Sequence, residues 1–211
     1  MVPCINVSLD VFENEPIPKL ATLMNEHISL TPHIGAATIE AQDRIGLELA
    51  TQIKEKLNGR LDALVNNAGI SQVKSFELLE DEDWQTMWET NFMSAVRCIK
   101  LALPAMIKKG GGRIINIASI GGQWGGVHQV HYAASKAALI NLTKSIAKSY
   151  SQEGICCNAV SPGLINTDMI ADELKQSDSN KLKNIPIGRH GTVDEVSSLV
   201  TFLCSEESSY I

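Results

Sequence analysis

The stretch SIGGQWGGVHQVHYAASK, residues 119–136, determines how this chain is interpreted. Ser119 ends the apolar segment GRIINIAS, and Tyr132 and Lys136 follow with four-residue spacing. Residues i and i+4 share one helix face, so both side chains are expected to point into one pocket. A nearby ammonium favours phenolate, so we expect Lys136 to lower the pKa of Tyr132 and Ser119 to hold the oxygen that gains or loses the proton. The pattern predicts proton donation to a carbonyl oxygen; the alternative is an ordinary amphipathic helix after a buried strand.

Apolar segments alternate with helical patterns along the chain. The strands are apolar throughout rather than alternating, which is typical of a parallel sheet covered on both faces. We therefore expect an α/β fold, a Rossmann-like doubly wound parallel sheet in three layers, forming one domain over residues 1–211. The expected strands are 5–12, 27–33, 61–65, 112–119 and 155–160; the expected helices are 19–26, 38–57, 81–109 with a bend at Pro104, 132–150 and 192–203.

Composition excludes several classes of function. The 211 residues carry 18 basic and 24 acidic side chains, a net charge of −6, without a basic cluster for nucleic acid. No apolar run approaches the roughly 18 residues of a membrane span, and the first residues lack the features of a signal peptide. The five cysteines have no metal-ligand or redox spacing. We expect a cytoplasmic protein with reduced thiols, no metal, no membrane and no nucleic acid.

Three motifs occur in a specific order. They are Asn66-Asn67-Ala68-Gly69 after a strand, the YAASK run ending at Lys136, and Ser161-Pro162-Gly163 after another strand. Together they resemble the short-chain dehydrogenase/reductases, most closely the 3-oxoacyl-carrier-protein reductase type, from about residue 59 to 211. The resemblance implies hydride transfer between NAD(P), NADP being the expected form, and a small carbonyl or alcohol substrate. It also implies a homodimer or homotetramer built on the helices of 81–109 and 132–150.

The same resemblance implies a role for each matching residue. Tyr132 would be the acid/base, Lys136 would lower its pKa and touch the nicotinamide ribose, and Ser119 would position the substrate carbonyl. Asn91, in the segment ETNFMSAV, would order a water near the lysine; the alternative is a buried helix asparagine that bonds locally.

Cofactor-binding roles follow in the same way. The strand-end residues Asn67, Ala68 and Gly69 would lie against the adenine-side ribose, although a plain turn also explains them. Ile165 and Thr167 would reach the nicotinamide carboxamide; the alternative is a loop residue and a helix cap.

The first part of the chain has a different resemblance. DVFENEP (10–16), LTPHIGAAT (30–38) and EAQDRIGLELA (40–50) resemble the end of the nucleotide domain in D-2-hydroxyacid dehydrogenases, most nearly phosphoglycerate dehydrogenase. That resemblance implies that Glu15 orients an acid/base His33; the alternative is a strand-end imidazole without a catalytic role. The chain is interpreted as a chimera of residues 1–58 and 59–211.

The glycine-rich turn that opens a short-chain reductase has no match in the sequence. Such a turn holds the cofactor pyrophosphate at a helix N-terminus, so we expect the fold to lack the usual first βα unit, and also the last strand. Residues 33–38 could substitute but contain one glycine, and Asp10 could imitate an acidic ribose-binding residue. An inactive scaffold is therefore the alternative function, and a D-2-hydroxyacid dehydrogenase fragment is a further one.

Overall fold

The computed structural model describes residues 7–9, 28–30, 61–167 and 185–211. Three strands, β3 (Ala63–Asn66), β4 (Gly112–Ile117) and β5 (Ile155–Val160), form a parallel sheet in the order β3-β4-β5. Two short strands, β1 (Val7–Leu9) and β2 (Ile28–Leu30), pair in parallel, and β1 contacts β3. Four lie within stretches that the sequence predicts as strands, and β3 overlaps the prediction for 61–65 but extends one residue beyond it, so the five strands are found where they were predicted.

Several sequence predictions fall outside the described residues. They are the helices expected at 19–26 and 38–57, the candidate phosphate turn at 33–38, and the side chains of Asp10, Glu15 and His33.

The helices lie close to their predicted positions. Their bounds are α3 (Asp81–Trp88), α4 (Ser94–Lys109), α5 (Gly121–Trp124), α6 (Val130–Tyr150) and α9 (Val193–Cys204), with short 3₁₀ turns η1 (Phe76–Leu78), η3 (Ser151–Glu153) and η5 (Glu206–Ser208). Sequence gives clear signals for two of the ends. Thr192 and Glu195 form a capping box at the start of α9, and Gly110 ends α4 in the left-handed region at φ 91°.

The long helical region of residues 81–109 is interrupted at a different place from the one predicted. A π-helical turn, η2 (Glu89–Met93), separates α3 from α4, whereas Pro104 lies inside α4. Asn91 is in this turn, and its side chain bonds to the backbone of Ile70. The sequence therefore predicts one long helical region where the structure has two helices joined by a widened π-turn, and this turn carries the Asn91 amide.

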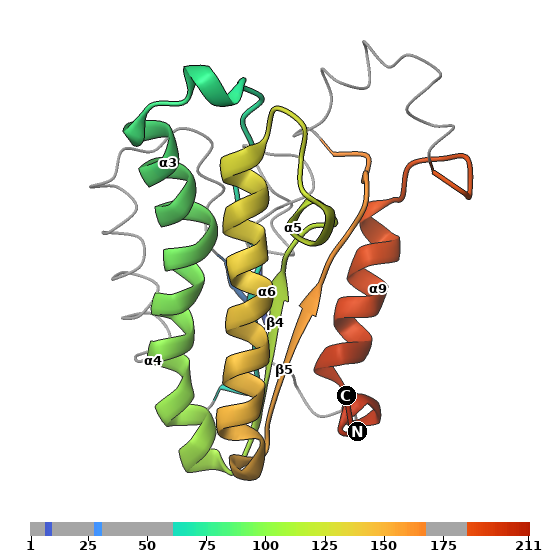
Figure 1. Cartoon of the computed structure of the whole chain (residues 1–211). Helices are drawn as coiled ribbons and strands as arrows, with labels where there is room; N and C mark the ends of the chain where they lie inside the picture. The colour runs from blue at the N-terminus through green and yellow to red at the C-terminus, as the bar shows by residue number, and fades with distance from the viewer. Residues whose placement is uncertain (1–6, 10–27, 31–60, 168–184) are drawn as a thin grey trace.

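Two apolar cores give the fold its three layers (Figure 1). Alternate residues of a strand face opposite sides of the sheet, so Leu64 and Ile114 join the helices α4 and α6 on one face. Val65 and Ile115 face the other side, where Leu203 of α9 covers them. The doubly wound arrangement predicted from the sequence is confirmed.

A chain of buried amides links the sheet to α6. Asn66 donates from Nδ2 to Oδ1 of Asn116 at 2.7 Å, and Asn116 donates from Nδ2 to Oγ1 of Thr143 at 2.8 Å. Thr143 in turn donates to the carbonyl of Leu139 at 2.8 Å. Buried polar groups are costly unless paired, so this chain fixes one register of β3, β4 and α6.

We predict that Asn116→Ala lowers the free energy of unfolding by about 2–4 kcal/mol, because the Asn66 amide loses its buried acceptor and the Thr143 hydroxyl loses the donor that Asn116 supplies. Urea denaturation followed by circular dichroism measures this. Asn141→Ala, on the exposed side of α6, is the matched control and should change stability by less than about 0.5 kcal/mol. Equal effects of the two substitutions would contradict the prediction.

Candidate active site

The candidate site lies where the three parallel strands end. Asn67 to Gly69 follow β3, Ser119 follows β4 by two residues, and Ile165 lies beyond β5. The carboxyl ends of parallel strands meet at one edge of a sheet, and ligands of open α/β folds bind there. Strand topology therefore brings together residues that are far apart in the sequence.

Tyr132 and Lys136 lie one turn apart near the start of α6. Lys136 is only 4% exposed, and its Nζ donates a hydrogen bond to the carbonyl oxygen of Ile117 at 2.9 Å. The same Nζ lies 5.9 Å from the ring centroid of Tyr132. The two side chains thus share a helix face, as their spacing predicts, and the lysine's ammonium is placed beside the phenol ring.

Ser119 reaches Tyr132 from the end of β4. The Ser119 side chain is close enough to Tyr132 to lower the pKa of the phenol, and its Oγ accepts from the backbone N–H of Gly121 at 3.1 Å. Both residues border Gly121: a Cβ placed there would lie 3.5 Å from Oγ of Ser119 and 3.8 Å from Cε1 of Tyr132. The serine, the tyrosine and the lysine therefore converge at one point.

The electrostatics of Tyr132 differ from the sequence-based expectation. Burial raises the pKa of Tyr132 above its ordinary value, and the hydrogen bond from Ser119 opposes this without cancelling it. The net shift is therefore opposite to the lowering expected from the spacing of Tyr132 and Lys136. The physical reason is that desolvation of the phenolate dominates, while the lysine's Nζ is hydrogen bonded to the carbonyl of Ile117. Tyr132 is a neutral phenol here.

Asn91 connects the lysine to the strand end of β3. It is 1% exposed; its Oδ1 accepts from the N–H of Ile70 at 2.8 Å, and its Nδ2 donates to the carbonyl of Ile70 at 2.9 Å. Its Nδ2 also lies 3.2 Å from Oγ of Ser135, which donates to the carbonyl of Tyr132 at 2.7 Å. These local bonds agree with the structural interpretation of Asn91 and also join it to the helix that carries Tyr132.

Gly69 lies directly against this group. A Cβ on Gly69 would be 3.1 Å from Nζ of Lys136 and 3.4 Å from Oδ1 of Asn91, which is tighter than ordinary contact. Glycine thus lets the chain after β3 pass close to the ammonium, and a larger residue would need the lysine side chain to move by a few tenths of an ångström. By contrast, Ile165 and Thr167 make local contacts: Ile165 bridges to Gly191, and Oγ1 of Thr167 lies 3.5 Å from the carbonyl of Ile165.

These residues fit the nicotinamide half of a dinucleotide cofactor. A buried ammonium beside a phenol, and a backbone that approaches it through glycine, suit a ribose hydroxyl and a reacting ring next to the tyrosine. For the pyrophosphate, the sequence offers only the substitute turn at residues 33–38, which lies outside the described ranges. The comparison with a cofactor therefore rests on the donor groups at the strand ends alone.

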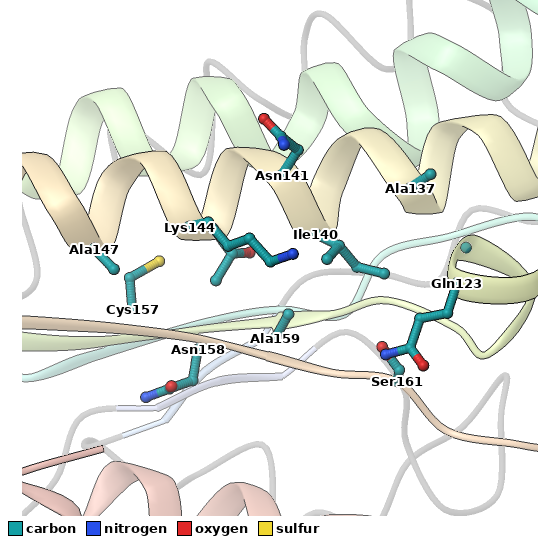
Figure 2. Close-up of a pocket in the computed structure, with 12 residues that line it drawn as sticks. Gln123, Ala137, Ile140, Asn141, Lys144, Ala147, Cys157, Asn158, Ala159 and Ser161 are labelled. Atoms are coloured by element: carbon teal, nitrogen blue, oxygen red, sulfur yellow. The ribbon is translucent and has the colours of Figure 1, made fainter.

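A pocket of about 660 Å³ lies beside the candidate site, between α6, α5 and β5 (Figure 2). Its walls include Ile140 and Lys144 of α6, Asn158 of β5 and Gln123 of α5, and none of the four predicted catalytic residues lines it. It adjoins the site through Gly122, where a Cβ would lie 2.7 Å from the carbonyl carbon of Lys136.

Sequence reasoning missed the supporting polar groups. Ser135 lies within the YAASK run, and its contacts with Asn91 and Tyr132 require knowledge of the fold. His131 is 1% exposed and bonds to Gln72, 59 residues away, so spacing gives no signal for it. Within the described ranges, no cluster of metal-binding side chains occurs, and no helix is long and apolar enough to cross a membrane.

Comparison with known proteins gives consistent matches. A family model described as enoyl-(acyl carrier protein) reductase matches residues 37–211. The 3-oxoacyl-[acyl-carrier-protein] reductase of Salmonella typhimurium is 37% identical over 195 residues, covering 90% of this chain and 80% of that protein. The same-named protein of Thermotoga maritima is 34% identical over 192 residues, covering 91% and 78%. That of Aquifex aeolicus is 44% identical over 154 residues, covering 72% and 61%.

These matches extend further towards the N-terminus than the motifs indicate. The family model begins at residue 37, and a match to 90% of the chain has to include part of residues 1–58. The converging serine, tyrosine and lysine lie inside the matched region. The chain belongs to the short-chain dehydrogenase/reductase family of oxidoreductases.

Proposed function

We propose that this chain transfers hydride between NAD(P)H and a carbonyl or alcohol substrate of the 3-oxoacyl type. The observation that carries this proposal is the convergence of Ser119, Tyr132 and Lys136 at the ends of parallel strands, with Tyr132 buried as a neutral phenol. The names of the relatives, 3-oxoacyl-[acyl-carrier-protein] reductases, support the substrate class.

Tyr132 acts as the proton donor. Its raised pKa keeps the hydroxyl protonated near neutral pH, so it can donate to the carbonyl oxygen as the carbonyl carbon accepts hydride. Ser119 holds the same oxygen by a hydrogen bond, which orients the carbonyl towards the phenol. When bound, the nicotinamide supplies the hydride. A neutral phenol can donate a proton to the carbonyl oxygen but cannot accept one from an alcohol. This arrangement therefore suits reduction of the carbonyl.

Lys136 and Asn91 support this proton transfer. The buried ammonium beside the ring stabilises the phenolate that remains after donation, and it is placed to bind a ribose hydroxyl. Asn91 holds the chain after β3 near the lysine through Ile70. The family resemblance implies that it would also order a water beside the lysine. Asn67, Ala68 and Gly69 would bind the adenine-side ribose, and Ile165 and Thr167 the carboxamide; NADP is the expected cofactor.

The N-terminal segment is proposed to be part of the same domain. Contact between β1 and β3 supports one Rossmann-like domain over residues 1–211. The motifs that resemble a D-2-hydroxyacid dehydrogenase support a chimeric origin for residues 1–58, while the family match from residue 37 limits how much of that segment is foreign. A cytoplasmic location is proposed from the free thiols and from the class of the relatives.

One observation favours a second candidate function. The glycine-rich turn that holds the pyrophosphate has no match in the sequence, and each missing charge-assisted contact would cost about 1.5–3 kcal/mol of binding. A chain that retains the catalytic group but cannot hold the cofactor would be an inactive scaffold. Cofactor binding separates the two candidates.

We predict that Tyr132→Phe lowers carbonyl reduction by about 100- to 10,000-fold, because the proton donor is removed while the ring is kept. NADPH titration followed by nicotinamide fluorescence should give saturable binding at micromolar concentration for both proteins. Tyr150→Phe, at the far end of α6, is the matched control and should keep full activity. Absence of NADPH binding to the unmodified chain would favour the inactive scaffold, and reduction that survives Tyr132→Phe would remove the proposed role of Tyr132.

We predict that Ser119→Ala raises the pKa of Tyr132 further, because the hydrogen bond that opposes the effect of burial is lost. Ultraviolet absorbance measures phenolate formation as the pH is raised. Subtracting the titration of the matching Tyr132→Phe variant from that of each protein isolates Tyr132 from the other tyrosines. The ionisation of Tyr132 should move to higher pH in Ser119→Ala. A shift to lower pH would show that the serine does not stabilise the phenolate.

We also propose a homo-oligomer built on α3, α4 and α6. Large apolar side chains are exposed on the first two helices, including Trp88, Leu101 and Ile107, which is typical of an interface. Leu101→Lys is predicted to shift sedimentation from dimer or tetramer towards monomer. Leu199→Lys, on α9 in the opposite layer, is the matched control and should leave the dimer intact. A monomer for the unmodified chain at high concentration would contradict the proposal.

A further inference from the structure

The first turn of α6 is held from outside the helix. Its N-cap, Gln129, makes no capping hydrogen bond; instead its Nε2 donates to Oγ of Ser71 at 3.0 Å. The backbone N–H of Lys74 donates to the carbonyl of His128 at 2.8 Å. The segment 71–74, which follows the strand end of β3, therefore anchors the start of the helix that carries Tyr132.

We call these contacts between residues 71–74 and the start of α6 the clamp. Its central contact joins Gln72 to His131. Oε1 of Gln72 lies 2.8 Å from Nε2 of His131, and Nε2 of Gln72 donates to Oδ1 of Asp83 at 2.9 Å. Asp83 is itself held by Nζ of Lys74 at 2.6 Å and by the N–H of Glu80 at 2.9 Å. Because the Gln72 amide must turn its NH₂ towards the carboxylate, its oxygen faces the imidazole, and Nε2 of His131 carries the proton.

His131 is buried in a form that suits only this contact. The ring is 1% exposed, packs edge-on against Trp84 at 5.9 Å between centroids, and its Nδ1 has no hydrogen-bond partner among the described residues. Burial lowers the pKa of His131, with Asp83 opposing the shift and Lys74 adding to it. The neutral imidazole has one N–H donor, on Nε2, and Oε1 of Gln72 accepts from it, so the hydrogen bond can form in only one orientation. A buried Nδ1 without a partner is a cost that the Gln72 contact offsets.

We propose that His131 and Gln72 are positioning residues that hold the Tyr132 hydroxyl against Ser119. This inference rests on the proposed function, in which Tyr132 donates the proton. His131 directly precedes Tyr132, and Gln72 connects it through Asp83 to the start of α3. Neither side chain has to touch the substrate for this role.

Lys136 has its own anchors, so the clamp acts mainly on the tyrosine. Its Nζ bonds to the carbonyl of Ile117, and its backbone packs against Gly122 of α5. Loosening the first turn should therefore displace Tyr132 more than Lys136. We expect a loss in kcat with little change in the NADPH dissociation constant, because small misplacement of a catalytic group lowers rate more than binding.

The test compares His131→Phe, Gln72→Met and the double variant. His131→Phe keeps a ring against Trp84 but removes the donor, and Gln72→Met keeps the length of the side chain but removes the acceptor. Each single variant should lower kcat about tenfold, and the double variant should also lose about tenfold rather than a hundredfold, since one contact is removed in all three. Gln85→Met, on the exposed face of α3, is the matched control and should keep the kcat of the unmodified chain.

A second readout does not depend on turnover. The ionisation of Tyr132 should move to higher pH in His131→Phe and in Gln72→Met, because the contact of Tyr132 with Ser119 is weakened. It is measured as the difference between each variant and the same variant carrying Tyr132→Phe. Gln72→Met, on a surface segment, keeps the test valid where His131→Phe does not fold. Unchanged kcat and unchanged Tyr132 titration in Gln72→Met, or losses that multiply in the double variant, would overturn the proposal. If the unmodified chain turns nothing over, the titration still decides on the clamp.

Discussion

A single buried amide, that of Asn91, is the contact on which the rest of the site depends. It satisfies both backbone groups of Ile70 and reaches Ser135 on α6, so it joins the end of β3, the turn η2 and the tyrosine helix. Removing the amide would leave the N–H and the C=O of Ile70 without their protein partners in a partly buried position, which we expect to destabilise this contact. Asn91 lies in the π-helical turn η2, and its side chain reaches Ile70 from there.

The position of Ile70 then determines how close the preceding glycine comes to Lys136. Gly69 passes so near the ammonium that a Cβ would be 3.1 Å away, which closes the site on the side of β3. At Tyr132, burial raises the pKa of the phenol more than the serine lowers it. The phenol is therefore protonated near neutral pH, as proton donation requires.

Structural features that depend on the spacing of nearby residues can be predicted from the sequence. Apolar strands, the helix bounds and the shared face of Tyr132 and Lys136 all follow from periodicities of two and 3.6, and the structure has them. The sign of the Tyr132 pKa shift could not be predicted in the same way, because burial is produced by segments that are far apart in the sequence. His131 shows the limit most clearly, since its partner Gln72 is 59 residues away. The π-turn was missed because Pro104 is a visible helix breaker and the hydrogen bonds of Asn91 are not visible in a sequence.

The N-terminal strands bear on how the site is supported. β3 pairs with β4 along one edge, and β1 contacts β3 although the two belong to separate ladders. An edge strand without a neighbour exposes unpaired backbone groups, which costs free energy where the surroundings are apolar. Val7–Leu9 lies beside the strand that leads into Asn67, Ala68 and Gly69. Strand β1 therefore contacts the strand that positions the glycine against Lys136, which supports the proposal that the N-terminal residues belong to the same domain.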